Sequence, residues 1–469
     1  MVQESQWTTK VTHGLLWVFA LAWAFDFKAD VGEGAQGGSL AQALFLLVAC
    51  LSGGAAMVLS GRQLLLRPGV WLLLLWWGFL GYIALTSLGQ GVEPGRFARI
   101  VLPYLMIGLG LGVAQAAAGR GLTPMQIVTP MVAAGVINVV WRVVYGFMFK
   151  GATLETARME VFSPAMNPLF AYLGAAMLLR PRFHWTNLAV AAVALGGVLI
   201  SVTRGLLFPI VTAGVVGTGC FVLGAAWGVF SLRQIPRKVV ALVGGGAFGL
   251  MVLGGAQVAA PTLIERWSQR LFHHAGNNTS ADLSWLTREA EAQGMLTILE
   301  KDPVHFVIGK GMGGSYYWDP SYWPELWTVY PSNYDFSGDI WFNGHSVWTY
   351  TLFSGGGIGL VLHLAFFGAA VLHGLAAVRA SARSGRVDGQ TWLGFLPVFT
   401  VCCLLSESFT SNQLAERLAG VMLGLSAGLP QALYRSTRRR TAGVPVAGVA
   451  CQPPSLRLAP SPPVPTHVR

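Results

Sequence analysis

The sequence predicts an all-α integral-membrane protein with about twelve transmembrane helices and one large external loop that contains short helices. Three observations predict this fold class. The chain is 54% hydrophobic and only 11% charged, long apolar runs recur along most of it, and basic residues gather on alternate connections between those runs. Soluble globular domains carry about twice this share of charge. The composition therefore excludes a soluble fold.

The apolar runs are long enough to cross the hydrocarbon core of a membrane as helices, which takes roughly 20 residues each. The first run follows a polar start without a small-residue cleavage site, so we expect a retained first span. Residues 185–227 could also form one element that breaks around Arg204. The expected spans are residues 11–26, 39–59, 68–87, 99–118, 125–147, 164–179, 185–203, 205–227, 238–260, 344–376, 392–411 and 416–434.

The positions of Lys and Arg predict the orientation of the spans, because cytoplasmic loops collect basic residues. Most basic residues fall on alternate connections, which places both termini in the cytoplasm. The formal charge of +11 then reflects topology and contact with anionic membrane lipids, and a nucleic-acid partner is not expected. The basic residues that fall on or beside the opposite connections are Lys28, Arg96, Arg99, Lys150 and Arg158.

The chain divides into four parts by composition. Residues 1–260 carry the N-terminal transmembrane helices, residues 261–344 form the large loop, and residues 345–434 carry the C-terminal transmembrane helices. Residues 435–469 are basic and then Pro-rich, so we expect a disordered cytoplasmic tail.

The large loop is the part where we expect function, since long loops in compact proteins usually carry it. A capping sequence at residues 279–282 and the spacing of apolar residues predict an amphipathic helix over residues 282–301. Asp302-Pro303 ends this helix, and the glycines of residues 309–314 predict a flexible turn. Aromatic residues are dense over residues 316–350. They either form an interfacial belt or offer flat faces to sugar rings.

His345 lies where the large loop meets the tenth expected span. A neutral histidine with an ordinary pKa of about 6.5 can accept a proton from a hydroxyl at neutral pH. Gly344 removes bulk beside it, and the glycines around Gly356 allow close approach of backbone or ligand. These neighbours favour a catalytic base over the alternative, a histidine with a purely interfacial role.

Arginines supply a second group of candidates, on the same side of the membrane as His345 by charge alternation. Arg204 lies between two apolar runs, Arg288 on the expected loop helix, Arg266 earlier in the loop and Arg142 near the outer end of the fifth span. A guanidinium group binds phosphate oxygens in a bidentate way, so these residues could hold a pyrophosphate. Alternatively, Arg142 snorkels to the interface and Arg266 faces lipid headgroups.

Carboxylates that could bind a metal are weak candidates. Asp26, Asp30 and Glu33 cluster in the first external loop, and Asp335 and Asp339 lie four residues apart in the large loop. A divalent ion could stabilise a leaving diphosphate through such oxygen ligands, but solvated loops explain both clusters better. The cysteines show neither zinc-site spacing nor a disulfide framework for the loop. No metal or cofactor is expected.

The pattern around His345 resembles the motif of bacterial O-antigen ligases. His345-Ser346 is followed by nine residues, Gly356, two more residues and Gly359. The resemblance covers roughly residues 10 to 430, and its specific part lies within about residues 200 to 360.

Two basic positions are also similar to signatures of this family. Arg204 stands in a Thr-Arg-Gly turn after a helix of small residues, and Arg288 stands in a helix that leads to Gly309 and Gly311.

The resemblance implies a multi-pass glycosyltransferase of the GT-C type in a bacterial inner membrane, with its site facing the periplasm. Such an enzyme moves O-antigen from undecaprenyl pyrophosphate to a sugar hydroxyl of the lipid A core in lipopolysaccharide biosynthesis, without nucleotide sugar or metal. His345 would take the acceptor proton. Arg204 and Arg288, with Arg142 and Arg266, would bind the diphosphate, and attack from the opposite face would invert the anomeric centre.

Other functions remain open at this point. An O-antigen polymerase and a protein O-oligosaccharyltransferase would share the loop and the reaction class. A secondary transporter would also fit about twelve spans, but transporters place their sites at the bilayer midplane on broken helices related by internal repeats. The sequence shows no such repeat, and its candidate residues gather on one face.

Overall fold

The computed structural model describes residues 2–27, 40–65, 69–153, 160–182, 184–272, 283–327, 341–408 and 411–441. These residues are largely helical, and the only β-type pairing among them is a single bridge between Tyr316 and Trp341. Within this part of the chain, seven helices are long and apolar enough to cross a membrane. The protein is therefore an all-α membrane protein, while the expected total of twelve spans stays a prediction.

The helices fall into three groups by length and place. The long apolar helices are α2 (Leu40–Ser60), α3 (Val70–Gly89), α4 (Pro94–Gly119), α5 (Pro124–Val144), α9 (Leu207–Ala226), α10 (Ile235–Ala259) and α15 (Val347–Arg383). The other bundle helices are α1 (Val2–Leu21), α7 (Met166–Leu179), α8 (Trp185–Ser201), α16 (Leu396–Glu407), α17 (Arg417–Gly428) and α18 (Pro430–Thr441). The large loop contributes α11 (Pro261–Phe272), α12 (Leu283–Glu300), α13 (Pro303–Ile308) and α14 (Trp323–Leu326).

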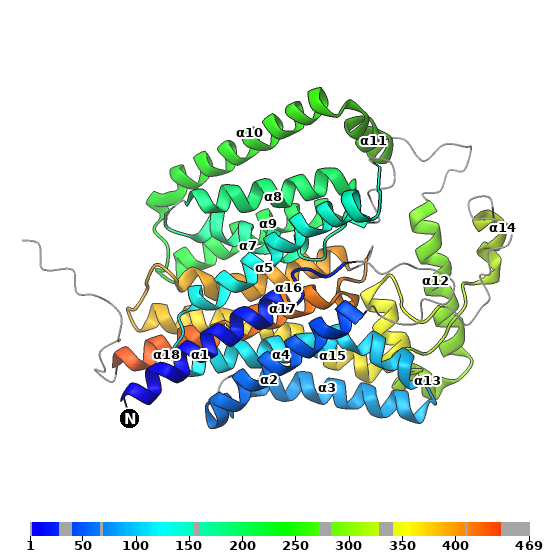
Figure 1. Ribbon diagram of the computed structural model, residues 1–469, viewed down its shortest axis with the longest axis horizontal. Helices are drawn as coiled ribbons and strands as arrows, with labels where there is room; N and C mark the ends of the chain where they lie inside the picture. Colours follow the sequence, from blue (N-terminus) through cyan, green and yellow to red (C-terminus); the bar gives the residue numbers. More distant parts are fainter. Residues whose placement is uncertain are drawn as a thin grey trace, which may run out of the picture.

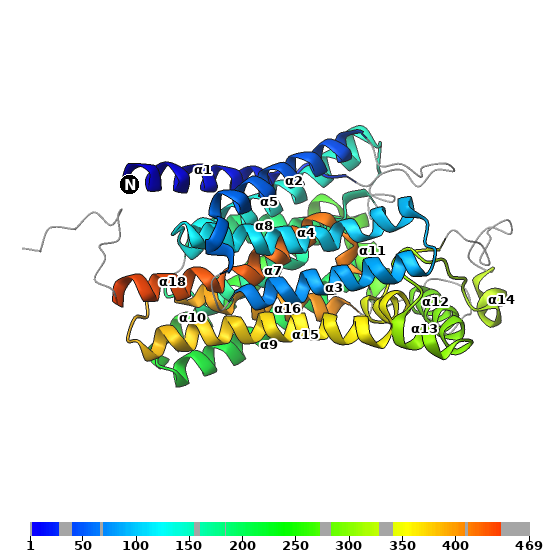
Figure 2. The same cartoon turned by 90° about the horizontal axis from the view of Figure 1, so that it is seen from below.

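The bundle helices run roughly along one axis, and the loop helices α12 to α14 lie beyond one end of the bundle (Figures 1 and 2). We call this the loop end. The centre is built on close contact between α4 and α17, where a Cβ on Gly424 would lie 2.3 Å from the Ile107 carbonyl oxygen. Small residues let two helix backbones approach in this way, which strengthens van der Waals packing in a membrane.

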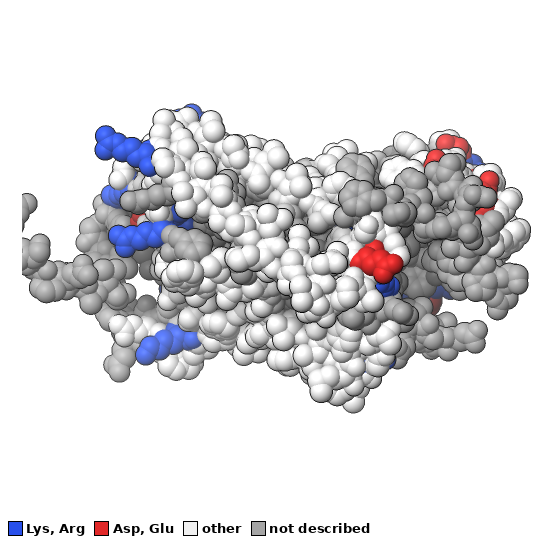
Figure 3. Space-filling model, turned by 90° about the horizontal axis from the view of Figure 1, so that it is seen from above, with Lys and Arg blue, Asp and Glu red and all other residues white. Residues whose placement is uncertain are grey.

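Basic side chains gather at the opposite end of the bundle, which we call the basic end. On the face drawn in Figure 3, most of the visible Lys and Arg side chains lie there. The described basic residues on the connections expected at this end are Lys10, Arg120, Arg180, Arg182, Arg233, Lys238, Arg379, Arg383, Arg386 and Arg435. This separation agrees with the alternation of charge along the chain. Which end faces the cytoplasm remains a prediction.

The expected spans 185–203 and 205–227 form as two separate helices, α8 and α9. Val202 takes a left-handed conformation (φ 45°) and the turn Arg204–Leu206 separates the two helices, so residues 185–227 are not one element. Residues 416–434 are expected as one span but divide into α17 and α18 at Leu429, since Pro430 cannot continue the backbone hydrogen bonding of a helix.

The expected loop helix is confirmed as α12, which ends one residue before the predicted boundary of residue 301. Asp302 then caps the next helix, since its side chain accepts a hydrogen bond of 3.0 Å from the Val304 amide. The capping sequence at residues 279–282 lies outside the described residues.

The glycine segment after α13 is hydrogen-bonded to α15. The Lys310 amide donates to the Phe353 carbonyl at 2.8 Å, and the Gly311 amide donates to the Ser354 carbonyl at 3.0 Å. These carbonyls lie just before Gly356, whose φ of +60° interrupts the helical geometry of α15. The loop is thereby hydrogen-bonded to a break in the long helix.

We expect Gly356→Ala to destabilise this junction. The left-handed backbone is unfavourable for a residue with a Cβ, and that atom would lie 2.3 Å from the Val307 carbonyl oxygen. The strain is about 1–3 kcal/mol and should lower the Tm in detergent. Gly368→Ala in the same helix is the control, because a Cβ there meets nothing within 4 Å. Equal Tm values for the two variants would contradict the proposed packing.

Candidate functional site

The backbone around His345 is fixed at the loop end by the segment that follows α16. His345 stands two residues before α15, after Gly344, whose carbonyl accepts a hydrogen bond of 3.1 Å from the Asn412 side chain. The Val347 amide donates to the Ser408 carbonyl at 3.2 Å. The first turn of α15 and the preceding residues are therefore joined to the C-terminal part of the bundle, and this sets the position of the histidine.

The His345 ring is paired with the carboxylate of Glu291 on α12. The Nδ1 atom lies 3.1 Å from Glu291 Oε2, and the His345 backbone amide lies 3.1 Å and 3.3 Å from the two carboxylate oxygens. The Glu291 side chain is 2% exposed, whereas the His345 side chain is 54% exposed. The network assigns the ring proton to Nδ1, so Nε2 of the neutral ring is left as a proton acceptor.

Tyr316 holds the other carboxylate oxygen of Glu291. Its hydroxyl donates a hydrogen bond to Glu291 Oε1 and lies 3.1 Å from the Asn343 carbonyl oxygen. Burial, followed by the negative charge of Glu291, raises the pKa of the Tyr316 phenol well above its usual range. The phenol therefore keeps its proton at neutral pH and remains a donor. The Tyr316 amide donates a hydrogen bond of 2.9 Å to the Trp341 carbonyl, and this β-bridge positions the tyrosine.

Glu291 and Tyr316 are not among the site residues that the sequence predicts. Glu291 follows Ala290 on α12, and both residues are buried. An acidic residue next to the apolar face of the predicted helix was therefore the one sign in the sequence that Glu291 is buried. Tyr316 carried no distinct signal, because it is one of many aromatic residues in the loop.

Arg288 is the candidate arginine nearest to this group by helix geometry. It stands three residues before Glu291 on α12, and side chains at this spacing are neighbours on one helix face, with Cβ atoms about 5–6 Å apart. The association of Arg288 with His345 stays a prediction.

Arg204 and Arg266 lie at a neighbouring corner of the loop end. Arg204 begins the turn between α8 and α9, and Arg266 is on α11. The Trp267 indole donates a hydrogen bond of 3.0 Å to the Leu199 carbonyl, which fixes α11 against the last turns of α8. The described contacts do not join these two arginines to His345 directly.

Arg142 is buried near the end of α5, with 4% of its surface exposed. This burial is incompatible with snorkelling to the interface. Its Nε atom has no hydrogen-bond acceptor among the described residues. Asn138 lies one turn earlier on α5. Its side chain donates a hydrogen bond of 3.1 Å to the Ala24 carbonyl and accepts one of 2.7 Å from the Ser163 hydroxyl, so it joins α5 to the segments around these two residues. A buried guanidinium in such a place normally has an anionic partner.

The interpretation of Asp26 as part of a solvated loop is wrong. Asp26 is 1% exposed, and its Oδ1 accepts hydrogen bonds from the Gln42 side chain at 3.0 Å and the Phe27 amide at 2.9 Å. Its Oδ2 lies 3.4 Å from Arg417, which ties the segment after α1 to the start of α17. Both oxygens of the carboxylate therefore have partners within the protein. The other acidic candidates, Asp30, Glu33, Asp335 and Asp339, lie outside the described residues.

Glu407, for which the sequence suggests no role, connects α16 to α7. Its oxygens accept hydrogen bonds of 2.9 Å from Asn167 and 2.8 Å from Gln413. Asn412, which precedes Gln413, bonds to the residue before His345. Glu407 therefore belongs to a buried polar layer that supports the backbone of the site.

The aromatic residues of the loop serve largely as its core. Tyr316 and Trp318 are each 2% exposed, and Trp318 stacks on Trp341 with ring centroids 4.6 Å apart. Neither buried ring is available to a lipid interface or a sugar. Arg96 and Arg99 lie over the Phe342 ring, at 5.8 Å and 5.9 Å from its centroid. Both arginines depart from the predicted alternation of charge. The cation–π contact with Phe342 holds them beside the site.

Comparison of the sequence with models of known protein families and with curated proteins finds no match. The function is therefore inferred from the geometry of the site and from the pattern of residues around it.

We expect Glu291→Ala to destabilise the protein. The His345 amide and the Tyr316 hydroxyl would lose a buried acceptor, and a buried donor without a partner costs about 1–3 kcal/mol. A lower Tm in detergent is the expected result, with Glu300→Ala at the exposed end of the same helix as the control. A Tm equal to that of the control would show that the carboxylate does not hold these donors.

Proposed function

We propose that this protein is an integral-membrane glycosyltransferase of the O-antigen ligase type. In this proposal it transfers O-antigen from undecaprenyl pyrophosphate to a sugar hydroxyl of the lipid A core, on the periplasmic side of the inner membrane. The observation that carries the proposal is the pairing of His345 Nδ1 with the buried carboxylate of Glu291, while more than half of the histidine side chain stays exposed.

The pairing suits His345 to act as a general base. In the proposed reaction, Nε2 takes the proton of the acceptor hydroxyl as its oxygen attacks the anomeric carbon of the glycan. The bond from that carbon to the diphosphate oxygen breaks, and its electron pair leaves with the diphosphate. Glu291 holds the ring orientation and stabilises the imidazolium that forms, in the way that a buried carboxylate supports a catalytic histidine. Attack opposite the leaving group inverts the anomeric centre.

Arginines are proposed to bind the diphosphate and to stabilise its departure. Arg288 is the main candidate because it neighbours Glu291 on α12. Arg142 supports the same role, since its buried guanidinium has an Nε without an acceptor among the described residues. Arg204 and Arg266 complete the group at the loop end. Phosphate oxygens match the donors of guanidinium groups in charge and geometry.

The same groups could serve a polymerase or a protein O-oligosaccharyltransferase, which differ in the acceptor that receives the glycan. We favour the ligase because the residue pattern around His345 is fuller than polymerases usually show. A transporter is less consistent with the described site, because Glu291, the partner of His345, stands on α12, a loop helix beyond the end of the bundle rather than midway along it.

We expect His345→Ala to abolish glycan transfer while the protein stays folded. Loss of a general base lowers the rate by about 10²–10⁴-fold. The measurement is glycan transfer by purified protein in detergent or vesicles. His305→Ala is a matched control, because His305 also pairs with a carboxylate, at 3.1 Å from Asp302, but lies on α13. Near-normal turnover of His345→Ala would remove this histidine from the mechanism.

We expect Arg288→Lys to lower transfer by about tenfold or more, because a point charge cannot replace a bidentate guanidinium on a phosphate group. Arg383→Lys, at the basic end, should transfer glycan at the normal rate. Steady-state rates at several donor concentrations measure the effect. Full activity of Arg288→Lys would make Arg288 a structural residue.

We expect chelators to leave transfer unchanged, since arginines rather than a divalent ion neutralise the diphosphate in this mechanism. The measurement is the transfer rate of protein washed with EDTA, with and without added Mg²⁺ or Mn²⁺. Loss of activity that only a divalent ion restores would return the loop carboxylates, Asp335 and Asp339 among them, to consideration as metal ligands.

A further inference from the structure

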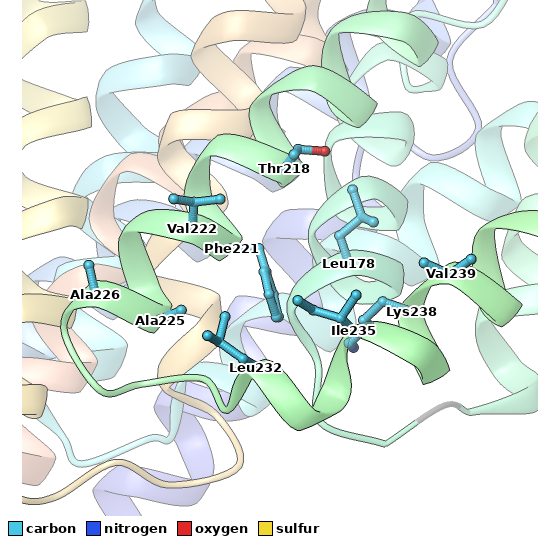
Figure 4. A pocket seen from close by; sticks show the side chains of 10 residues that line it. All are labelled: Leu178, Thr218, Phe221, Val222, Ala225, Ala226, Leu232, Ile235, Lys238 and Val239. Carbon is cyan, nitrogen blue, oxygen red and sulfur yellow. The ribbon is translucent and has the colours of Figure 1, made fainter.

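An apolar slot lies in the basic-end half of the bundle, away from His345. It has a volume of about 490 Å³ and is formed by α9, by the start of α10 and by Leu178 near the end of α7 (Figure 4). Phe221 and Val222 on α9 and Ile235 on α10 supply much of its apolar wall. None of the residues that line it is acidic, and Lys238 is its one charged residue.

The shape of the slot follows from the packing of α9 and α10. Phe221 stacks on Phe230 with centroids 5.6 Å apart, and a Cβ on Gly224 would lie 2.4 Å from the Phe230 ring, so this wall is closely packed. By contrast, none of the described side chains in the apolar stretch of α10 is buried against the protein. Figure 1 shows α10 at the outer edge of the bundle. The slot therefore opens toward the lipid.

Basic residues lie on the segments that line the slot and on the residues next to them. The Lys238 ammonium donates a hydrogen bond of 3.4 Å to the Met177 carbonyl and another to the Arg180 carbonyl, at the end of α7. An ammonium has three N–H donors, so these two contacts leave one for a ligand. Arg233 is exposed and follows Leu232, which lines the slot, and Arg182 is exposed two residues beyond Arg180.

We propose that the slot binds one acyl chain of an anionic glycerophospholipid of the bilayer, with its phosphate held by Lys238 and Arg233. The apolar wall matches a hydrocarbon chain, and the basic rim matches a headgroup with a net negative charge. Basic pockets between transmembrane helices recognise anionic lipids in this way. This lipid site lies away from the proposed glycan-transfer site, and the proposal does not depend on the glycan-transfer function.

The test measures lipid binding by native mass spectrometry of the detergent-purified, full-length protein. Phosphatidylglycerol and phosphatidylcholine with identical acyl chains are the two probes. We expect tighter binding of phosphatidylglycerol, weakened about fivefold by Lys238→Gln, because one basic residue near a lipid headgroup contributes about that much. Arg233→Gln should act in the same direction. If Lys238→Gln does not fold, Arg233→Gln still tests the proposal.

Two further variants test whether the lipid lies in the slot itself. Ala225→Trp fills the slot and should remove most phosphatidylglycerol binding. Val215→Trp, at an exposed position of α9 outside the lining, is its control, and Arg379→Gln on α15 is the control for charge. Equal binding of the two lipids, or unchanged binding by Ala225→Trp, would overturn the proposal. Displacement of phosphatidylglycerol by a neutral polyprenol of the carrier-lipid type would overturn it as well.

Discussion

The buried carboxylate of Glu291 is the group on which the geometry of the loop end depends. Burial of an unpaired carboxylate is strongly unfavourable, so this side chain requires donors. The His345 amide, the His345 ring and the Tyr316 hydroxyl supply them. One acidic residue of α12 thus holds both ends of the loop segment that runs from residue 316 to residue 345. The same contacts orient the histidine ring.

A second junction explains why α12 lies where Glu291 can reach His345. The segment after α13 bonds to the carbonyls of Phe353 and Ser354, and the Tyr82 hydroxyl lies 3.0 Å from both the Ile308 and the Gly355 carbonyl oxygens. The break in α15 at Gly356 therefore provides a docking point for the loop. In the motif that resembles O-antigen ligases, this glycine has a structural role that is separate from any contact with a ligand.

Features that depend on local sequence could be predicted well. The loop helix ends one residue before its predicted end, and the long helix α15 begins two residues after His345, close to the predicted junction of loop and span. Local periodicity and capping residues carry this information.

Pairings between distant residues could not be predicted in this way. Glu291 is 54 residues from His345, and Asp26 is 391 residues from Arg417. Their partners are set by helix packing, which a single sequence does not encode in any local pattern.

The two ends of the bundle have different chemistry. The loop end combines a hydrogen-bonded histidine with a buried arginine and a layer of hydrogen-bonded polar residues, whereas cationic side chains gather at the basic end. A transferase that uses lipid-linked substrates needs both, since catalysis requires fixed polar groups and a stable position in the bilayer requires favourable lipid contacts.

The most direct test of this account is to identify which molecule carries the glycan after the purified protein has been incubated with polyprenyl-diphosphate glycan and lipid A core. The account predicts glycan attached to a sugar of the core and release of the polyprenyl diphosphate. Longer glycan chains that remain on the lipid carrier, or a core that stays unmodified while active protein consumes the donor, would contradict it.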